Sequence, residues 1–199
     1  MGDLYKTKLK RVFDVVGAII LLIATSPILI ITAVLIRICL GSTVIFKQQR
    51  PGLYGKIFVL YKFRTMKNLY HEDGNPLSDE KRLTKFGLFL RRLDLDELPE
   101  LWNILKGDMS FVGPRPLLVE YLGKYKSSQF QRHDVKPGLT CLGVLKRCNM
   151  SWKEQFKYDI LYVKNVNFLL DVKLIVYTLY AVALQRGKKG GTWTREKFC

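Results

Sequence analysis

The sequence predicts a mostly helical α/β protein that is attached to a membrane by an apolar segment near its N-terminus. Residues 15–36 contain no charge over 22 positions, a run long enough for a membrane helix. Residues 42–66 alternate as two short strands do, and later segments repeat apolar residues at helical spacing. Because no internal repeat or second domain is evident, we expect a single domain over residues 1–199.

The composition favours partners that carry negative charge. The chain has 33 basic and 17 acidic residues, a net charge of +16, which suits nucleic acid, anionic lipid or phosphorylated substrates. No recognition helix or aromatic-basic strand motif is present, so we expect no nucleic-acid partner. Two histidines and four cysteines without a C-x-x-C pair argue against zinc and favour free thiols in a reducing compartment.

The N-terminal apolar run has a proline at its centre. As a helix, Val15–Ile36 would be about 33 Å long, enough to span a membrane. Pro27 interrupts helical hydrogen bonding, and the neighbouring Ser26 can satisfy a freed carbonyl. Basic residues flank the run on both sides, so the positive-inside rule gives no preference for opposite faces. The residues alone allow either a kinked spanning helix or one that bends at Pro27 and returns to the same face.

Two short strands follow, within residues 42–66. Pro51-Gly52 and Gly55 mark the turn between them. Lys62 and Arg64 then begin a basic cluster that is either a solvated edge of the sheet or an anion-binding site.

Five later segments complete the predicted architecture. Residues 68–80 are polar and turn-rich and should form a mobile loop. The pattern predicts helices at 83–92 and 117–135. A further apolar helix at 168–184, interrupted by two charges, should dock on the protein or lie at the membrane interface. The tail, 187–199, is basic and glycine-rich, and we expect it to be loosely ordered.

The most informative stretch is LDLDELPELWNILKGDMSFVGPRP, residues 93–116. Proline belongs in the first turn of a helix, so Pro99 predicts a helix that begins near Asp96, with Asp96 at the N-cap, and ends at Gly107. One buried stripe is expected, formed by Leu98, Leu101, Trp102 and Leu105.

Asp96 and Glu97 are therefore expected at a helix start, where free N–H groups favour anions. A carboxylate there can act as a nucleophile or a magnesium ligand. The simpler alternative is that Asp96 only caps the helix. Arg115 lies between two prolines, and such a rigid arginine suits bidentate phosphate binding, although it is also compatible with a surface turn. Together these residues indicate a phosphoryl-transfer site, with Arg91 close enough to neutralise a substrate phosphate.

The run DELPELWNILKGDMSFVGPRP, residues 96–116, resembles the signature of the bacterial sugar transferases, the monotopic phosphoglycosyl transferases. The resemblance extends from about Lys10 to Phe198. It implies a re-entrant helix-break-helix over residues 12–37, with Ser26 and Pro27 at the break, and a small cytoplasmic catalytic domain. It also places the motif YKFRTM, residues 61–66, near the active site.

The resemblance implies an enzyme of the bacterial inner membrane whose active site faces the cytoplasm. The implied reaction transfers a sugar 1-phosphate from a UDP-sugar to polyprenol (undecaprenyl) phosphate and releases UMP. This is the first membrane step of glycoconjugate assembly, and downstream glycosyltransferases are partners. Asp96 would form a covalent phosphosugar intermediate, and Mg²⁺ would be held by Asp96 and Glu97. The phosphate contacts would come from Lys62, Arg64, Arg91 and Arg115.

Two details bear on the specificity of the enzyme. The short chain and its TREKF tail resemble transferases that begin bacterial N-linked protein glycosylation with diacetylbacillosamine. The segment Thr140–Met150, TCLGVLKRCNM, departs from the pattern of the family. That departure leaves an alternative, a catalytically silent relative that anchors partner enzymes at the membrane.

Overall fold

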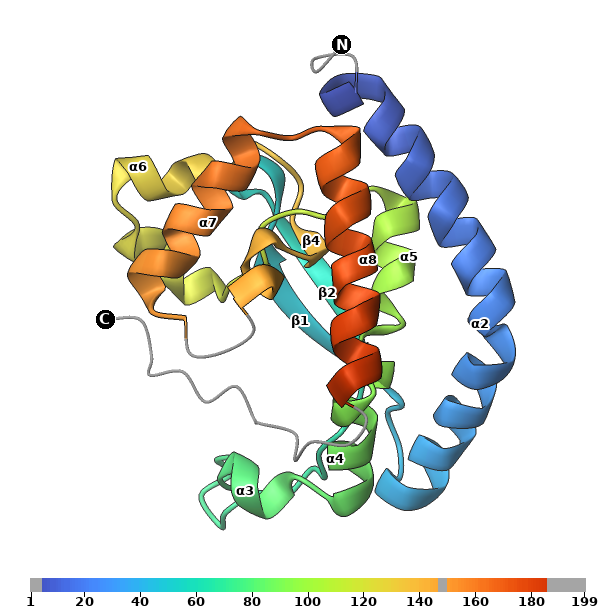
Figure 1. The fold of residues 1–199 in the computed structure, drawn as a ribbon. Coiled ribbons are helices and arrows are strands. Elements are labelled where there is room, and N and C mark those ends of the chain that lie inside the picture. The colour runs from blue at the N-terminus through green and yellow to red at the C-terminus, as the bar shows by residue number, and fades with distance from the viewer. Residues whose placement is uncertain (1–4, 147–149, 186–199) are drawn as a thin grey trace.

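The computed structural model describes residues 5–146 and 150–185 (Figure 1). The predicted tail, 187–199, lies outside the described residues. The helices are η1 (Tyr5–Leu9, a π-helical turn), α2 (Lys10–Leu40), α3 (Asp79–Arg82), α4 (Lys85–Arg92), α5 (Glu100–Lys106), α6 (Ser127–Phe130), α7 (Trp152–Lys164) and α8 (Phe168–Gln185). The 3₁₀ turns are η2 (Leu53–Gly55), η3 (Leu95–Glu97), η4 (Val119–Lys124), η5 (Gln131–His133) and η6 (Leu142–Lys146). The strands are β1 (Ile45–Pro51), β2 (Ile57–Phe63), β3 (Ser110–Val112) and β4 (Gly138–Thr140).

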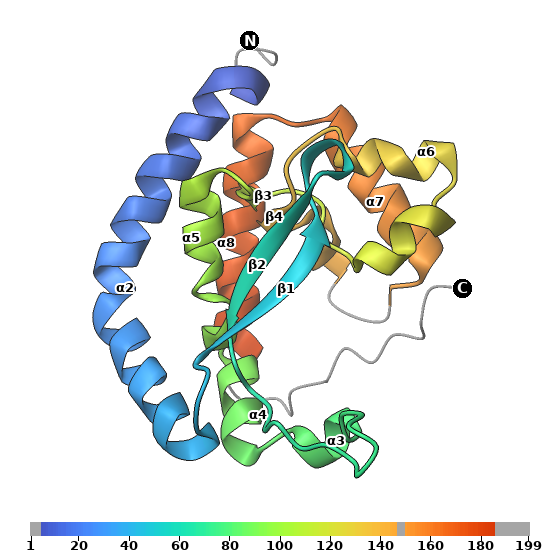
Figure 2. The same cartoon turned by 180° about the vertical axis from the view of Figure 1, so that it is seen from behind.

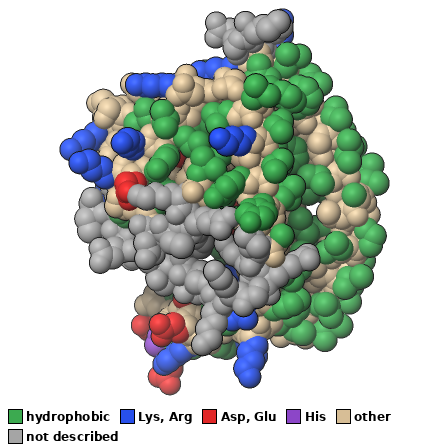
Figure 3. Space-filling model, viewed as in Figure 1, with side chains coloured by type: hydrophobic (Ala, Val, Ile, Leu, Met, Phe, Trp, Pro, Cys, Tyr) green, Lys and Arg blue, Asp and Glu red, His purple; other side chains and the backbone are tan. Residues whose placement is uncertain are grey.

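Helix α2 forms a long arc around one side of the molecule (Figures 1 and 2). It continues through Pro27 without interruption. Because it runs from Lys10 to Leu40, the helix extends beyond the predicted segment, 12–37, at both ends. The hydroxyl of Ser26 donates to the carbonyl of Ile23 at 2.8 Å. In a regular helix this carbonyl would accept a hydrogen bond from the N–H of residue 27, which proline lacks. By length and composition α2 could cross a membrane. Hydrophobic side chains cover its outer edge (Figure 3), and Ile23 and Ile30 are 70% and 64% exposed.

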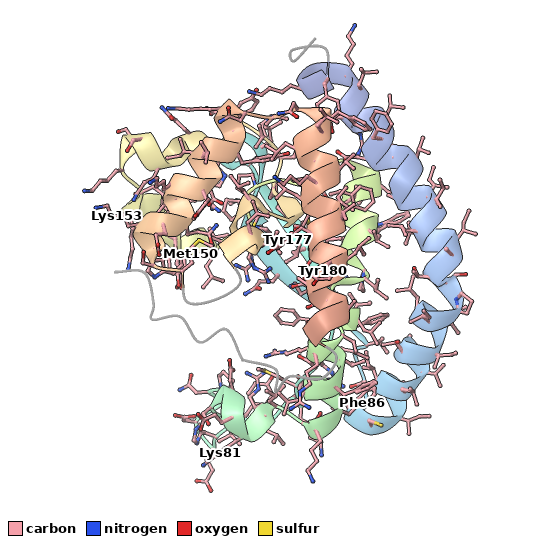
Figure 4. All side chains as sticks on the ribbon, viewed as in Figure 1. Lys81, Phe86, Met150, Lys153, Tyr177 and Tyr180 are labelled. Atoms are coloured by element: carbon pink, nitrogen blue, oxygen red, sulfur yellow. The ribbon has the colours of Figure 1, made fainter. Side chains whose placement is uncertain are left out.

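The predicted strands at 42–66 are confirmed as an antiparallel hairpin. β1 pairs with β2 in a register that runs from Ile45 opposite Phe63 to Pro51 opposite Ile57. The hairpin packs on α5 and the first half of α2 through a cluster of buried apolar residues, namely Ala18, Leu60, Leu101, Ile104 and Met109. A second cluster closes the far end of α2, where Phe86 of α4 packs against Ile36, Leu40, Phe63 and Leu90 (Figure 4).

A second, smaller sheet joins the C-terminal half of the chain to the centre. β3 and β4 are parallel, with Ser110 opposite Gly138 and Val112 opposite Thr140. Helices α7 and α8 cover this region through a cluster that includes Val112, Leu142, Tyr162 and Leu174. The helix predicted at 168–184 is confirmed as α8, and the one predicted at 83–92 is confirmed as α4.

The single helix predicted for residues 117–135 is wrong. The segment is divided into η4, α6 and η5. Tyr125 has an extended backbone (φ −74°, ψ 136°), and its ring packs against Phe156 and His133. This packing holds the chain away from the helical path that its apolar spacing would otherwise favour.

Candidate active site

The hairpin delivers Lys62 to a group of acids. The Nζ of Lys62 lies 2.6 Å from Oε1 of Glu97 and 3.0 Å from Oε1 of Glu100. Burial lowers the pKa of Lys62, but Glu97 and Glu100 outweigh this effect, so the pKa lies above its ordinary value. Lys62 is therefore a fixed positive charge shared by two carboxylates.

The acids lie on a turn whose shape differs from the predicted helix start. Asp94 has a left-handed backbone (φ 51°), the 3₁₀ turn η3 follows, and α5 begins only at Glu100 with Pro99 in the N-cap position. The prediction that Asp96 caps the helix is therefore wrong. Proline is tolerated at position 99 because an N–H group at the start of a helix has no acceptor within the helix. The predicted end of the helix at Gly107 is confirmed.

Asp96 and Glu97 are adjacent in sequence but differ in their partners. Oε1 of Glu97 accepts hydrogen bonds from Lys62 and from Nη2 of Arg115, the latter at 3.0 Å. Burial raises the pKa of Glu97, but the charges of Arg115 and Lys62 outweigh it and lower the pKa to about 2. In the part of the chain that the structure describes, Asp96 forms no ion pair. Burial and the charge of Glu97 raise the pKa of Asp96.

Glu100 was not predicted as part of the site. It is 3% exposed, and burial together with the charge of Glu97 raises its pKa to about 7. The signal that could have found it is its spacing, because residues three apart lie on the same side of a helical turn. Glu100 follows Glu97 at this spacing and shares Lys62 with it.

The Gly113–Pro116 turn is fixed by close backbone contacts. A Cβ on Gly138 would lie 2.0 Å from the amide nitrogen of Gly113, so only glycine fits there. Gly113 donates to the carbonyl of Thr140, and Gly138 donates to that of Pro114.

Behind this turn, Nη2 of Arg132 donates to the carbonyl of Arg115 at 2.6 Å and pairs with Asp159 at 2.8 Å. This pair is buried, with both side chains at most 2% exposed. The backbone of Arg115 is thus held from behind, while its 55% exposed side chain reaches Glu97.

These groups surround a cavity of about 210 Å³. Three of the residues predicted from the sequence line it, namely Lys62, Glu97 and Arg115, and Glu100 lines it as well. Asp96, the neighbour of Glu97 in the chain, is not among the lining residues. The remaining wall is mainly apolar and aromatic, with one more cation. Its lining residues are Arg50, Leu60, Pro116, Leu117, Leu118, Tyr121, Gly138, Leu139 and Trp152.

Arg64 and Arg91 lie apart from the cavity lining. The guanidinium of Arg64 is buried against the end of α2, where it donates to the carbonyl of Leu40 and the hydroxyl of Thr43. The Nε of Arg91 donates to the hydroxyl of Thr65 at 3.0 Å. Arg91 acts on the site through its charge, which opposes the effect of burial on the pKa of Asp96. Ser26 and Pro27 lie on α2, away from the cavity lining.

Few side chains at this site could act as ligands of a metal ion. Among the described residues, no three His, Cys, Asp or Glu side chains are grouped so that they could hold one. Asp96 and Glu97 are two adjacent carboxylates, and the charge of Glu97 raises the pKa of Asp96. This pair suits a cation that takes one or two protein carboxylates and completes its shell with phosphate oxygens, as Mg²⁺ does.

The comparisons with known proteins agree on one family. A family model described as bacterial sugar transferase matches residues 5–185. The chain is 50% identical over 180 residues to the uncharacterized sugar transferase EpsL of Bacillus subtilis. The aligned region covers 90% of this chain and 89% of EpsL.

Two longer relatives carry names that state a reaction. A UDP-glucose:undecaprenyl-phosphate glucose-1-phosphate transferase of Klebsiella pneumoniae is 36% identical over 186 residues, 86% of this chain. An undecaprenyl-phosphate galactose phosphotransferase of Salmonella typhimurium is 36% identical over 197 residues, 90% of this chain. The matched regions span 39% and 41% of these two proteins.

Proposed function

This chain belongs to the bacterial sugar transferase family, and we propose that it transfers a sugar 1-phosphate from a UDP-sugar to polyprenol phosphate and releases UMP. The observation that carries the proposal is the contrast between two adjacent carboxylates. Glu97 is held by Lys62 and Arg115, whereas Asp96 forms no ion pair within the described residues. One acid is thus committed to holding cations, and the other is free to react.

Asp96 is the proposed nucleophile. One of its carboxylate oxygens attacks the phosphorus that bears the sugar, the bond from that phosphorus to the UMP oxygen breaks, and UMP leaves with the bonding electrons. An oxygen of the polyprenol phosphate then attacks the same phosphorus and displaces the Asp96 carboxylate. The raised pKa of Asp96 supports this role, because a more basic carboxylate is a better nucleophile.

The neighbouring charges hold the phosphates. Glu97 remains ionised because its pKa is lowered to about 2, and it fixes Lys62 and Arg115 beside the cavity. Arg115 presents a planar guanidinium suited to a phosphate oxygen pair. Arg91 contributes positive charge near Asp96.

Mg²⁺ is the proposed cofactor, with Asp96 and Glu97 as the residues that would hold it. The fit rests on the repulsion between these two carboxylates and on the absence of an ion-pair partner for Asp96 among the described residues. When bound, Mg²⁺ would neutralise negative charge on the diphosphate.

The proposed site faces the cytoplasm at the bacterial inner membrane, and α2 enters the membrane and returns to the same side. A polyprenol acceptor requires a site beside the lipid, and α2 provides an exposed apolar surface. Single cysteines at positions 4 and 43, in a variant whose four native cysteines are replaced by serine, should both resist labelling by a membrane-impermeant reagent added to intact cells. Labelling of either cysteine from outside would make α2 a spanning helix.

The reaction is tested by a screen for UMP release with polyprenol phosphate and Mg²⁺. UDP-glucose and UDP-galactose follow from the names of the relatives, and UDP-diacetylbacillosamine follows from the resemblance of the chain to N-glycan transferases. With a sugar-labelled donor but no acceptor, label should remain on the denatured protein and map to Asp96. Label on Glu97 would reverse the roles of the two acids.

The alternative of a silent, membrane-anchored scaffold predicts no turnover with any UDP-sugar. Its motivation was the divergent segment Thr140–Met150, of which residues 147–149 lie outside the described residues. The cluster of Lys62, Glu97 and Arg115 is fully assembled, which supports an active enzyme. Its lipid-linked product would be the substrate of downstream glycosyltransferases.

A further inference from the structure

The charges around the cavity do not balance. Three cations line it, Arg50, Lys62 and Arg115, but only two carboxylates, Glu97 and Glu100. Both carboxylates are engaged by Lys62, and Glu97 also by Arg115. Arg50 has no ion-pair partner in the part of the chain that the structure describes. Since arginine stays charged, at least one positive charge remains to be matched by an occupant of the cavity.

Arg50 is held in place by neutral groups. Its Nη2 donates to the side-chain oxygen of Gln48 at 2.6 Å, and its Nη1 donates to the carbonyl of Pro116 at 3.3 Å. Its Nε is buried and has no hydrogen-bond partner among the described residues. A buried donor without a partner is costly, so an acceptor from a ligand would remove this cost.

Arg50 also lies close enough to Arg115 for the two charges to interact. Burial and the charge of Arg115 lower the pKa of Arg50, and the charge of Glu100 only partly opposes them. Two guanidinium groups on one cavity repel each other, and a group with two or more negative oxygens between them would relieve the repulsion. Phosphate has this chemistry.

The wall beyond these arginines is suited to a flat ring. Tyr121 of η4 and Trp152 at the start of α7 lie edge to face, with ring centroids 5.4 Å apart, and both line the cavity. Stacking on aromatic side chains stabilises any nucleobase, because every base has a flat π-face. The cavity therefore joins an unmatched cation to an aromatic surface.

We propose that Arg50 binds a phosphate of the substrate, that this phosphate belongs to the leaving nucleotide, and that its base lies against Tyr121 and Trp152. The inference rests on the proposed function and adds to it the residue and the surface that bind the nucleotide. The phosphate of the polyprenol acceptor has the same chemistry and is the alternative source.

The test uses the full chain in lipid nanodiscs with variants matched in charge. Arg50→Gln removes the guanidinium, and Arg50→Lys keeps the charge. Lys47→Gln removes one charge from an exposed residue of the same strand, and it lies on the opposite face of β1 because side chains alternate along a strand. The Michaelis constants for the UDP-sugar and for polyprenol phosphate are measured separately, together with inhibition by UMP and by uridine.

Arg50→Gln should raise the KM for the UDP-sugar and the inhibition constant of UMP by about 10- to 100-fold, as expected for loss of a charge-assisted hydrogen bond. Inhibition by uridine, which has no phosphate, should not change. Trp152→Leu should weaken inhibition by both compounds. Arg50→Lys should show an intermediate effect, and Lys47→Gln should differ from the wild type by less than about twofold.

Each contrary result has a distinct meaning. A higher KM for polyprenol phosphate alone would assign Arg50 to the acceptor and overturn the nucleotide assignment. If Arg50→Gln matched Lys47→Gln in both constants, Arg50 would bind no substrate phosphate, while turnover by the wild type would leave the proposed function intact. If the wild type released no UMP from any UDP-sugar, the proposed function would fail, and the role of Arg50 would fail with it.

Discussion

Two clusters of charged and polar side chains in this protein look alike in composition but differ in how completely they are satisfied. Around Asp171, on α8, Tyr5 donates to one carboxylate oxygen at 2.6 Å, Lys10 pairs with the same oxygen, and Tyr162 donates to the other at 2.7 Å. Asp171 is 3% exposed. Both carboxylate oxygens of Asp171 are thus engaged by side chains of the protein.

The cluster beside the cavity is incomplete. Lys62 serves two acids, Asp96 forms no ion pair and Arg50 pairs with no carboxylate, within the described residues. The Asp171 cluster joins the start of α2 to α8, so its role is to hold two helices together. The comparison separates a closed cluster, which holds the fold together, from an open one next to a cavity, which leaves charges for a ligand to match.

The largest effect should come from Asp96→Asn. The amide has the size of the carboxylate but cannot form an acyl phosphate, so we expect turnover to fall by about 10³-fold or more. The variant should remain folded, because Asp96 caps no helix and forms no ion pair with any residue that the structure describes. UMP release and a thermal unfolding curve measure the two properties.

The matched control for this change is Asp94→Asn, two residues earlier. Asp94 has a left-handed backbone (φ 51°), which asparagine tolerates well. We expect its turnover to stay within a few-fold of the wild type. An equal loss in both variants would show that the acidic turn as a whole matters, and not Asp96 as a nucleophile.

The second effect concerns stability rather than chemistry. Asp171→Ala leaves the ammonium of Lys10 and the hydroxyl of Tyr5 without their acceptor, whereas the hydroxyl of Tyr162 can still donate to the carbonyl of Val112. Removal of one partner of a buried pair costs about 3–5 kcal/mol. Denaturant unfolding in detergent should show this loss in the free energy of unfolding. The fraction that remains folded should turn over normally. Wild-type stability in this variant would mean that the cluster does not hold α2 to α8.

Local patterns in the sequence predicted much of the fold. The hairpin has its own turn residues at Pro51-Gly52, α4 has its cap at Thr84, and α5 ends at Gly107. The single helix predicted for residues 117–135 was wrong because the Tyr125 ring packs against Phe156, a residue distant in the sequence. That packing overrides the helical spacing of the apolar residues.

The stripe predicted on α5 was partly wrong. Leu101 is buried, but Trp102 is 51% exposed and Ile104 is buried in its place. The helix packs its face at positions 101 and 104 against β2 and α2, and spacing alone does not tell which of two overlapping faces will be covered.

The site was predictable where its residues occur in one motif. Glu97 and Arg115 share the run 96–116, and Lys62 joins them through the hairpin. Arg50 and Trp152 come from β1 and α7, and only tertiary packing brings them to one cavity. Arg64, two residues after Lys62, lies elsewhere because the β2 strand has ended at Phe63 and its guanidinium reaches α2 instead.

The smallest effect is expected from Glu100, which shares features of both clusters. It is buried and paired with Lys62, as in the Asp171 cluster, yet it lines the cavity. Burial and the charge of Glu97 raise its pKa to about 7, compared with about 4.3 in an unfolded chain. Between these values the folded protein keeps a proton that the unfolded chain has lost, so its stability falls as pH rises from about 4.5 to 7. In Glu100→Gln this contribution to the change in the free energy of unfolding with pH is absent. We expect the wild type to lose about 1–2 kcal/mol relative to the variant across this window, measured by denaturant unfolding at pH 5 and pH 7. Equal slopes in the two proteins would show that Glu100 is ionised throughout, with Lys62 and not a proton balancing its charge.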